Sequence, residues 1–421
     1  MAREMKDSGV EWIGDIPNGW NITRNKFVMV KEKQICPIYK NQDVLSLTQK
    51  GVIVRDLDNP TGKMPTSFDG YQYIHKGNLL MCLFDIDVTP RCIGLIKDDG
   101  ITSPAYSQFI VNHGFANYYY YYYLMLDFSK ELLHLAKNLR YSLTEELLGF
   151  VPVPFPPLEE QKNISNFLDK KCSVIDSLTA DIEKQISLLE DYKKSIITEA
   201  VTKGLAPNVE MKDSGIEWIG AIPSQWKVEK IKFHLYRNDI KNPGDMEVLS
   251  LYREYGVVPK DSRDDNYNVT SLDVTKYKYV KPGNLVINKM KAWQGSLAVS
   301  EYEGIVSPAY YVYYFSDSSL VKKYFHYLVR ACYKDEFRRL SGGIREGQWD
   351  LPSEAFDNTL MIIPSMKEQK EIVSYLDKKC SEIDSLISEK KKQLEKLSSY
   401  KQSMIYEYVT GKKEVPTQEI A

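Results

Sequence analysis

Apolar residues recur at steps of three, four or seven along residues 157–204, in a segment otherwise rich in charge. This spacing places them on one narrow stripe of a helix, which is the pattern of a coiled-coil strand. Pro157 and the acidic pair Glu159 and Glu160 suit the first turn of this helix, and Gly204 suits its end. At about 1.5 Å per residue the helix would be roughly 65 Å long, so it needs a partner helix to bury its stripe.

The chain repeats this helix at residues 365–411. The segment LDKKCSVIDSL (Leu168–Leu178) returns as LDKKCSEIDSL (Leu376–Leu386), with one difference in eleven positions. This near-identity favours two helices that pack against each other over two unrelated core helices, although Lys390 interrupts the apolar stripe of the second. The predicted interface residues are Leu168, Ile175, Leu178, Ile182, Ile186, Leu189 and Ile196 in the first helix and Leu376, Ile383, Leu386, Leu394, Leu397 and Met404 in the second.

A second repeat opens each half of the chain. MKDSGVEWIGDIPNGW (Met5–Trp20) returns as MKDSGIEWIGAIPSQW (Met211–Trp226), with 12 of 16 residues identical. Two Trp residues that frame an Ile-Pro pair favour an irregular lead-in held by aromatic packing, and a short peptide-binding module is the alternative. A basic, strand-like run follows each copy, at residues 24–30 and 227–235.

Two globular segments follow the lead-ins, at residues 21–155 and 227–363, and both have the pattern of mixed strands and turns with one helical patch. Landmarks such as VLSL, GNL and SPAY recur in both segments in the same order, while the sequence between them differs freely. We therefore expect two domains with one scaffold and divergent loops, which is how one fold comes to recognise two different targets.

Composition excludes several classes of protein. The 421 residues suffice for two or three domains, with 43% hydrophobic and 27% charged residues, and no run of apolar residues is long enough to cross a membrane. Six cysteines without a CxxC pair indicate reduced thiols and no zinc site, so a cytoplasmic protein is expected. The net charge of −2 does not by itself indicate a nucleic-acid-binding protein.

We find no motif for a catalytic or cofactor site. The sequence contains neither the GxxxxGK[ST] phosphate loop nor GxGxxG after a strand. Asn59-Pro60-Thr61 and Asn242-Pro243-Gly244 both lack the second proline of the Asn/Asp-Pro-Pro-aromatic motif of amino-methyltransferases. Five scattered histidines leave a Ser/His/Asp or Cys/His site open, but no spacing proposes one.

Local features do support contact with nucleic acid. Residues 274–300 carry five lysines with interleaved tyrosine and tryptophan and no acidic residue. Lysines can neutralise phosphates, while Gln and Arg can read base edges; the alternative is a solvated lysine face on an edge strand. The candidate DNA-binding residues are Gln49, Lys50, Arg55, Arg91 and Arg140 in the first domain and Arg253, Lys276, Lys278, Lys289, Lys291, Trp293, Gln294 and Arg345 in the second.

The run of six tyrosines at Tyr118–Tyr123 permits two interpretations. It could form a stacking platform for bases. The interpretation we favour is a helix start whose tyrosines are half in the core and half on the surface, because YFHYL at Tyr324–Leu328 stands at the same place in the second domain.

The whole arrangement resembles the specificity subunit of type I restriction–modification enzymes. The resemblance covers essentially the whole chain and rests on the duplicated SGxEWIGxIPxxW lead-ins, both LDKKCS helices, and the helix starts PPLEEQ (Pro156–Gln161) and MKEQ (Met366–Gln369). The second helix start departs from the usual Pro-Pro-Leu, with Pro364-Ser365-Met366.

This resemblance implies an α+β fold with two similar mixed α/β target recognition domains, separated by two long antiparallel coiled-coil helices in a pseudo-two-fold repeat. The ranges would be a first recognition domain at 1–155, a spacer helix at 156–205, a second recognition domain at 206–363, a second spacer helix at 364–412 and a tail at 413–421.

The resemblance also implies a function. Each recognition domain would read one half of a bipartite site in double-stranded DNA, and the helix pair would set the length of the unread spacer and dock two methylation subunits, with restriction subunits completing the complex. The chain would carry no chemistry and no cofactor of its own. S-adenosylmethionine would bind the methylation subunit, and ATP and Mg²⁺ the restriction subunit.

Two alternatives come from other classes of protein. The first is a helical scaffold or decayed copy that binds partner subunits but not DNA. The second is a self-contained enzyme with an unfamiliar site, which the missing cofactor motifs disfavour.

Overall fold

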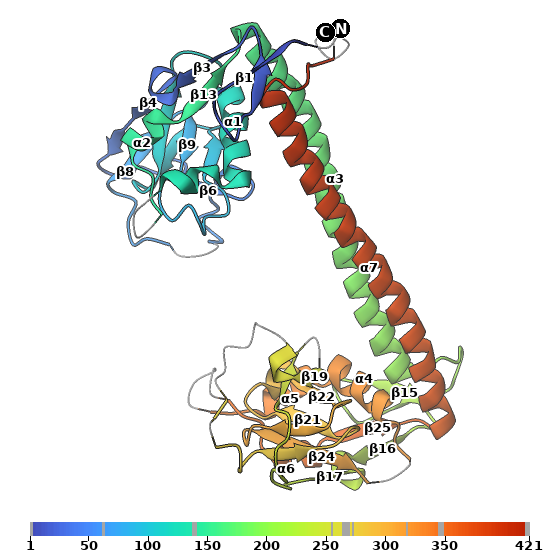
Figure 1. The fold of residues 1–421 in the computed structure, drawn as a ribbon. Coiled ribbons are helices and arrows are strands. Elements are labelled where there is room, and N and C mark those ends of the chain that lie inside the picture. The colour runs from blue at the N-terminus through green and yellow to red at the C-terminus, as the bar shows by residue number, and fades with distance from the viewer. Residues whose placement is uncertain are drawn as a thin grey trace. The chain divides into compact units, whose positions relative to one another are not determined.

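The structure is a computed structural model that describes residues 3–60, 64–136, 141–253, 256–262, 270–271, 273–316, 319–343 and 349–416. The chain divides into two compact units, unit 1 with residues 1–183 and 391–421 and unit 2 with residues 184–390. The two boundaries between the units, at residues 183/184 and 390/391, fall inside the long helices α3 (Leu158–Lys203) and α7 (Met366–Val409). Each unit therefore contains the start of one long helix and the end of the other (Figure 1).

Unit 1 packs a four-stranded antiparallel sheet, in the order β10-β9-β12-β4, against helix α1. A three-stranded sheet β11-β8-β5 and the pairs β6-β7, β13-β3 and β1-β2 complete it. The elements are β1 (Met5–Asp7), β2 (Asp15–Pro17), β3 (Asn21–Arg24), β4 (Met29–Glu32), β5 (Gln34–Cys36), β6 (Leu45–Thr48), β7 (Gly51–Val54), β8 (Tyr71–Ile74), β9 (Leu79–Met81), β10 (Ile93–Leu95), β11 (Gly100–Thr102), β12 (Ser107–Val111), α1 (Ala116–Ser129), α2 (Glu145–Phe150) and β13 (Pro152–Phe155).

Unit 2 has the corresponding four-stranded sheet, in the order β22-β21-β24-β17, with α4 packed on it. The pairs β20-β23, β18-β19, β16-β25 and β14-β15 complete it. The elements are β14 (Met211–Asp213), β15 (Ala221–Pro223), β16 (Lys227–Lys230), β17 (Leu235–Arg237), β18 (Leu249–Tyr252), β19 (Gly256–Pro259), β20 (Lys278–Val280), β21 (Leu285–Asn288), β22 (Leu297–Val299), β23 (Gly304–Val306), β24 (Tyr310–Phe315), α4 (Lys322–Cys332), α5 (Lys334–Leu340), α6 (Ser353–Asn358) and β25 (Leu360–Ile363).

The long helices run antiparallel within each unit. In unit 1 the rings of Phe167 and Tyr408 lie 4.5 Å apart, and farther along α3 Asp176 pairs with Lys401. In unit 2 Lys193 pairs with Asp384 at 2.7 Å. Residues with higher numbers in α3 therefore contact residues with lower numbers in α7, as antiparallel helices require. The predicted α+β fold, with its internal repeat and antiparallel helices, is confirmed.

Most predicted interface residues face the partner helix. Leu168, Ile175, Ile196, Leu376, Ile383 and Met404 are buried, and Ile182, Ile186, Leu189, Leu394 and Leu397 are half-buried. The prediction was wrong for Leu178 and Leu386, which are each 47% exposed. At the neighbouring positions Thr179 is half-buried, and Ile387 is buried in a cluster with Ile196 and Ile383. Both Leu178 and Thr179 satisfy steps of three or four between Ile175 and Ile182, so the spacing alone could not separate them. The polar Lys390 donates a hydrogen bond to Gln185.

The duplicated lead-ins are anchored through their second tryptophans, as expected, but they are not irregular, because β1 pairs with β2 and β14 pairs with β15. Trp20 and Trp226 are buried in the cores of their units. Trp20 Nε1 donates to Glu160 at 2.8 Å, and Trp226 Nε1 donates to Glu368 at 3.2 Å. The first turn of each long helix is therefore tied to the lead-in of its own unit.

The glutamines of PPLEEQ and MKEQ connect the same helix starts to the domains. The buried Gln161 accepts a hydrogen bond from the Phe115 N–H at 2.8 Å, just before α1. Gln369 accepts one from the Val321 N–H at 2.7 Å, just before α4. Because a helix start leaves backbone N–H groups without intrahelical partners, these side chains satisfy a donor and fix the two helices together.

The tyrosine run Tyr118–Tyr123 lies in α1, and only Tyr120 among its members is not fully buried. Tyr118 donates to the Val409 carbonyl at 2.7 Å, and Tyr121 donates to Asp169 at 2.7 Å. The helix interpretation is confirmed and the base-stacking platform is excluded for these buried rings, but the expected surface half of the run was wrong, because five of the six tyrosines are buried. In the part of the chain that the structure describes, all six cysteines carry free thiols. No helix within the described ranges is long and apolar enough to span a membrane.

Candidate nucleic-acid interface

In each unit a β-hairpin turn meets the loop between two sheet strands. In unit 1 the β6-β7 turn carries Gln49 and Lys50, and the β9-β10 loop carries Arg91. Arg91 Nη1 lies 3.8 Å from the position that a Cβ would take at Gly51 of the hairpin. In unit 2 Arg253 of the β18-β19 turn donates from Nη2 to Gln294 Oε1 of the β21-β22 loop, at 2.7 Å. The structure thus brings together candidates from separate stretches of sequence, at equivalent places of the two units.

The β21-β22 loop of unit 2 is tightly built. Asn288 Oδ1 accepts a hydrogen bond from the Met290 N–H at 3.2 Å, and Gly295 closes the turn with φ of +85°, a conformation that favours glycine. Trp293 Nε1 donates to the Met290 carbonyl at 3.0 Å. The side chains of this loop are therefore presented by a defined backbone.

Trp293 lies within a cluster of aromatic and cationic side chains. Its ring is 5.7 Å from that of Trp349, and the Arg338 guanidinium lies over it at 5.9 Å. Such cation–π and edge contacts hold a half-buried ring in one orientation. Sequence reasoning missed Arg338 and Trp349, because they approach the loop from segments about 50 residues later and no local motif marks them.

The lysines of residues 274–300 do not form one uniform face. Lys289 pairs with Asp350 at 3.0 Å, and Lys278 pairs with Asp239 at 3.3 Å. Burial lowers the pKa of Lys278, although the pairing with Asp239 opposes this. Lys276 and Lys291 are exposed. The ion pairs favour structural roles for Lys278 and Lys289, whereas Lys276 and Lys291 present their charge to solvent.

In unit 1 the β6-β7 hairpin lines one side of a pocket of about 520 Å³. Lys50, Arg91 and Lys97 line it from the domain, and Lys401 lines it from α7, together with Asp169 on α3. Lys97 and Lys401 were not among the candidates predicted from the sequence, since they come from the segment after β10 and from the second long helix. Asp98 and Asp176 also line the pocket, so it carries four basic and three acidic side chains, with Lys401 ion-paired to Asp176.

One further candidate, Arg55, lies elsewhere. Arg55 follows β7 with a half-buried side chain, and its N–H donates to the Val44 carbonyl at 2.8 Å. Arg140 and Arg345 lie outside the described residues.

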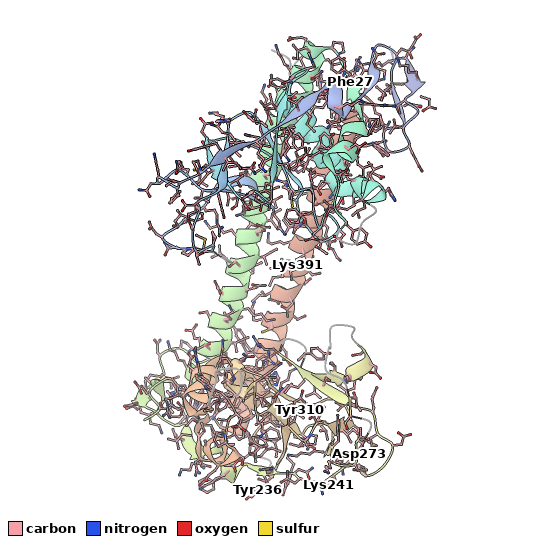
Figure 2. The ribbon with its side chains drawn as sticks, turned by 90° about the vertical axis from the view of Figure 1, so that its left-hand side faces the viewer. Phe27, Tyr236, Lys241, Asp273, Tyr310 and Lys391 are labelled. Carbon is pink, nitrogen blue, oxygen red and sulfur yellow. The ribbon has the colours of Figure 1, made fainter. Side chains whose placement is uncertain are left out.

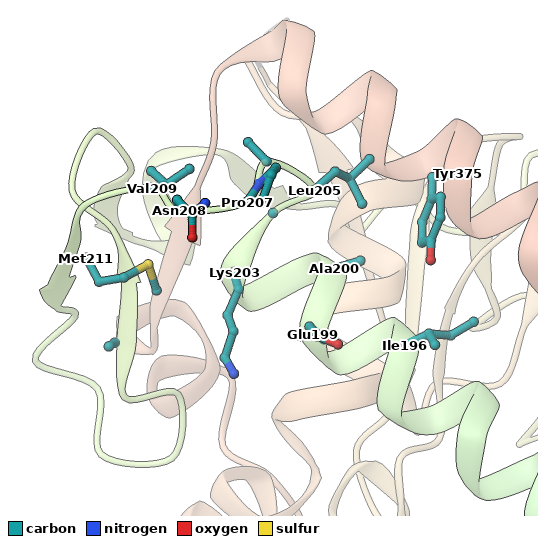
Figure 3. Close-up of a pocket in the computed structure, with 13 residues that line it drawn as sticks. Ile196, Glu199, Ala200, Lys203, Leu205, Pro207, Asn208, Val209, Met211 and Tyr375 are labelled. Carbon is teal, nitrogen blue, oxygen red and sulfur yellow. The ribbon is translucent and has the colours of Figure 1, made fainter.

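A second pocket, of about 810 Å³, lies at the end of α3 in unit 2 (Figure 3). Tyr375 of α7 and Ala200 of α3 line it, with Leu205, Pro207 and Met211 of the following segment. Tyr375 and Ala200 are the counterparts of Phe167 and Tyr408, whose rings pack together in unit 1. The pocket therefore opens where alanine replaces a large ring, and its charged lining residues are Glu199 and Lys203.

Each long helix also exposes large apolar side chains at repeat-related positions. Leu178 and Leu386 form one such pair, and Tyr192 and Tyr400, both more than half exposed, form another. Their duplication distinguishes them from apolar residues that are scattered singly over a surface.

Comparisons with known sequences identify a family that this chain matches. The family model of the type I restriction modification DNA specificity domain matches residues 94–188 and 230–396. The MjaVIII type I restriction enzyme specificity subunit of Methanocaldococcus jannaschii is 28% identical over 282 residues, which cover 62% of this chain and 62% of that protein. The putative MjaX specificity subunit of the same organism is 26% identical over 281 residues, 66% of this chain and 62% of that protein. The chain thus matches 62% of the length of these relatives.

A solved structure has the same fold. It concerns complex assembly and conformational transition of the type I R-M system, and one of its chains matches with a TM-score of 0.66 at 13% identity. The match covers 94% of this chain and 98% of that one.

Proposed function

This chain belongs to the family of type I restriction–modification DNA specificity domains, and we propose that it is the subunit that selects the DNA sequence on which such an enzyme acts. Each unit would read one half of a bipartite site. The observation that carries this proposal is the duplicated hairpin–loop site with different side chains, Gln49, Lys50 and Arg91 in unit 1 against Arg253 and Gln294 in unit 2. One scaffold with two sets of reading groups suits two different half-sites.

The chemistry of these side chains supports direct reading of bases. A guanidinium presents a fork of donors that fits guanine O6 and N7, and a Gln amide fits adenine N6 and N7. Arg253, held by Gln294, is the strongest candidate for such a contact in unit 2. Lys276 and Lys291 would meet phosphates, which position the protein without carrying sequence information.

The helix pair would set the length of the unread spacer. α3 comprises 46 residues, which corresponds to roughly 70 Å of helix at about 1.5 Å per residue. The duplicated ion pairs, Lys193 with Asp384 and Lys401 with Asp176, support a fixed register between the helices. A fixed register is what a constant distance between two half-sites requires.

The exposed pairs Leu178 and Leu386 and Tyr192 and Tyr400 would dock two copies of the methylation subunit, one for each half of the repeat. We propose that the chain supplies recognition without chemistry or a cofactor of its own. The methylation subunit would bring S-adenosylmethionine, and restriction subunits would bring ATP and Mg²⁺.

Selection from random DNA tests this function. The chain assembled with its methylation subunit would be incubated with a pool of random duplexes, and the retained duplexes would be sequenced. The proposal predicts two short conserved blocks with a constant unread gap. A single block, or no enrichment from an assembled complex, would contradict it and favour a scaffold that does not bind DNA.

A further inference from the structure

Helix α4 carries two polar side chains that reach the elements around the β18-β19 turn of unit 2. His326 and Arg330 are four positions apart, so they share one face of the helix. His326 Nδ1 accepts a hydrogen bond from the Val299 N–H of β22 at 3.4 Å. One turn farther along α4, Arg330 donates from Nη2 to the carbonyl of Arg253 in the β18-β19 turn. The half-buried Arg330 thus holds the backbone of an exposed candidate for base reading.

Arg253 is therefore held at its backbone and at the tip of its side chain. Arg330 holds its carbonyl, and Gln294 holds its guanidinium at 2.7 Å. A guanidinium has five N–H donors in a rigid fork, so one that contacts Gln294 can also meet the edge of a base. Two contacts on one residue favour a single direction of this fork.

The strands of the hairpin are held differently from its turn. Leu251 of β18 packs in an apolar cluster with residues of the four-stranded sheet. Tyr310 of β24, which is labelled in Figure 2, packs against the same cluster. Arg253 follows the end of β18, beyond this packing. The contact with Arg330 therefore ties the turn itself to α4.

Helices α1 and α4 are anchored to the long helices by equivalent tyrosines. Tyr118 of α1 donates to the Val409 carbonyl at 2.7 Å, and Tyr324 of α4 donates to the Val201 carbonyl at 3.2 Å. Val201 and Val409 occupy equivalent positions of the repeated helices α3 and α7. The repeat therefore aligns Tyr118 with Tyr324, and the two short helices can be compared position by position.

The position behind the hairpin differs between the two units. This alignment places Leu124 of α1 where α4 has Arg330. Leu124 lines the pocket beside the β6-β7 hairpin, together with Arg91. A leucine side chain cannot donate a hydrogen bond, so this position of unit 1 cannot supply the same contact. The residue behind the turn therefore differs together with the residue in the turn, Gln49 in unit 1 and Arg253 in unit 2, while the tyrosine anchors are alike.

We propose that Arg330 is a positioning residue for base recognition by unit 2, which sets the base preference of Arg253 without touching DNA. The inference rests on the proposed function, because it needs Arg253 to read a base. A hydrogen bond from a charged donor holds the carbonyl of the turn more firmly than a neutral one. Without it the guanidinium would meet the base edge in several directions. Discrimination between bases would then fall, while contacts with phosphates would persist.

The test compares base preferences position by position. The parent chain and the variants Arg330→Met and Arg330→Lys would each be assembled with the methylation subunit and used to select from random duplexes. Arg330→Met is expected to reduce the preference at one position of one half-site at least about fivefold and to leave the other half-site unchanged. Arg330→Lys keeps a charged donor and is expected to lose less of this preference.

A double-mutant cycle determines whether Arg330 acts through Arg253. Because both residues would serve one base contact, Arg330→Met combined with Arg253→Ala is expected to show the base preferences of Arg253→Ala alone. Effects that add would mean that Arg330 acts independently of Arg253, and they would overturn the inference.

Lys323→Met is the matched control, because it removes a positive charge from the same helix. Lys323 pairs with Asp377 of α7 at 2.7 Å. This variant is expected to keep every base preference of the parent, and all variants are expected to melt with the parent.

The remaining outcomes separate this inference from the proposed function. Unchanged base preferences in Arg330→Met would overturn the inference, while a parent that selects two blocks would still support the proposed function. A lower melting temperature with equal weakening at every position would also overturn it, because Arg330 would then be only structural. Weaker binding of all duplexes with a shallower salt slope would indicate a phosphate contact in place of positioning. A parent that selects no split motif would contradict the proposed function and the inference with it.

Discussion

Lys193 and Asp384 form an ion pair across the two long helices of unit 2, with Nζ 2.7 Å from Oδ2. Lys401 and Asp176 form the same pair in unit 1, with the lysine and the aspartate exchanged between the helices by the repeat. Two antiparallel helices can bury their apolar residues in several registers. An ion pair between the helices disfavours every register in which its two residues no longer meet. The two ion pairs therefore favour one register of the helices in unit 1 and one in unit 2.

Reversing one charge of this pair should destabilise the helices slightly. Asp384→Lys places like charges together, and because Lys193 and Asp384 are both partly exposed the loss should stay below about 1 kcal/mol. Chemical denaturation of the chain measures it. The double variant Lys193→Asp with Asp384→Lys should regain the stability of the parent, and a double variant no better than the single one would contradict the pairing.

Ile175 and Leu178 should lose very different amounts of stability on the same substitution. Ile175→Asp buries a charge without a partner in the helix interface and should cost at least about 3 kcal/mol. Leu178→Asp changes a side chain that is 47% exposed and should cost less than about 0.5 kcal/mol, while weakening the proposed docking of the methylation subunit. Denaturation and subunit titration measure the two effects. Equal destabilisation by both variants would mean that Leu178 belongs to the interface after all.

Arg253 should control one base preference in one half-site. Arg253→Ala should reduce affinity for the preferred base by about 1–3 kcal/mol, and Gln294→Ala should relax the same position because it frees the guanidinium. Selection from random DNA measures both preferences. The half-site read by unit 1 should stay unchanged, and changes in both half-sites would argue against independent reading units.

Lys291 and Lys289 should differ in their contribution to salt dependence. Lys291 is exposed, so Lys291→Ala should weaken binding for all sequences and reduce the salt slope by about one. Lys289 is paired with Asp350, so Lys289→Ala should change the slope less. Equilibrium binding at several salt concentrations measures the slope of log affinity against log salt. Identical slopes for the parent and Lys291→Ala would mean that Lys291 is a solvated surface residue without a phosphate contact.

His326 should make unit 2 sensitive to mild acid. Burial lowers the pKa of His326 to about 4, with Arg330 and Lys323 contributing, and its Nδ1 accepts a hydrogen bond from the Val299 N–H. The unfolded chain, with an ordinary pKa of 6.5, binds this proton first, so stability falls as the pH drops from about 6.5 to about 4, by up to about 3 kcal/mol. His326→Gln should flatten this part of the stability curve, and a curve parallel to that of the parent would contradict the assignment.

The sequence was sufficient to predict structural elements that follow from a periodic or duplicated pattern of residues. The steps of three and four predicted both long helices, and the copy of LDKKCS predicted that they belong together. It was insufficient where two neighbours satisfy the same spacing, as Leu178 and Thr179 do, because only packing shows which one faces the partner helix.

Contacts between distant segments were also beyond the sequence. The motif PPLEEQ was visible, but the hydrogen bond of Gln161 to Phe115 was not, since it joins positions 46 residues apart. The lysines of residues 274–300 looked uniform until Asp239 and Asp350 were seen beside Lys278 and Lys289. The base-reading residues stay predictions, because their role depends on where DNA lies against the loops.

We propose that one chain reads two half-sites at a fixed separation. The most direct measurement is to co-express the chain with its methylation subunit and map N6-methyladenine across the host genome by long-read sequencing. We expect a split motif with a constant unread gap at every modified site. Methylation that is absent or follows no split motif, from a complex shown to have assembled, would contradict it.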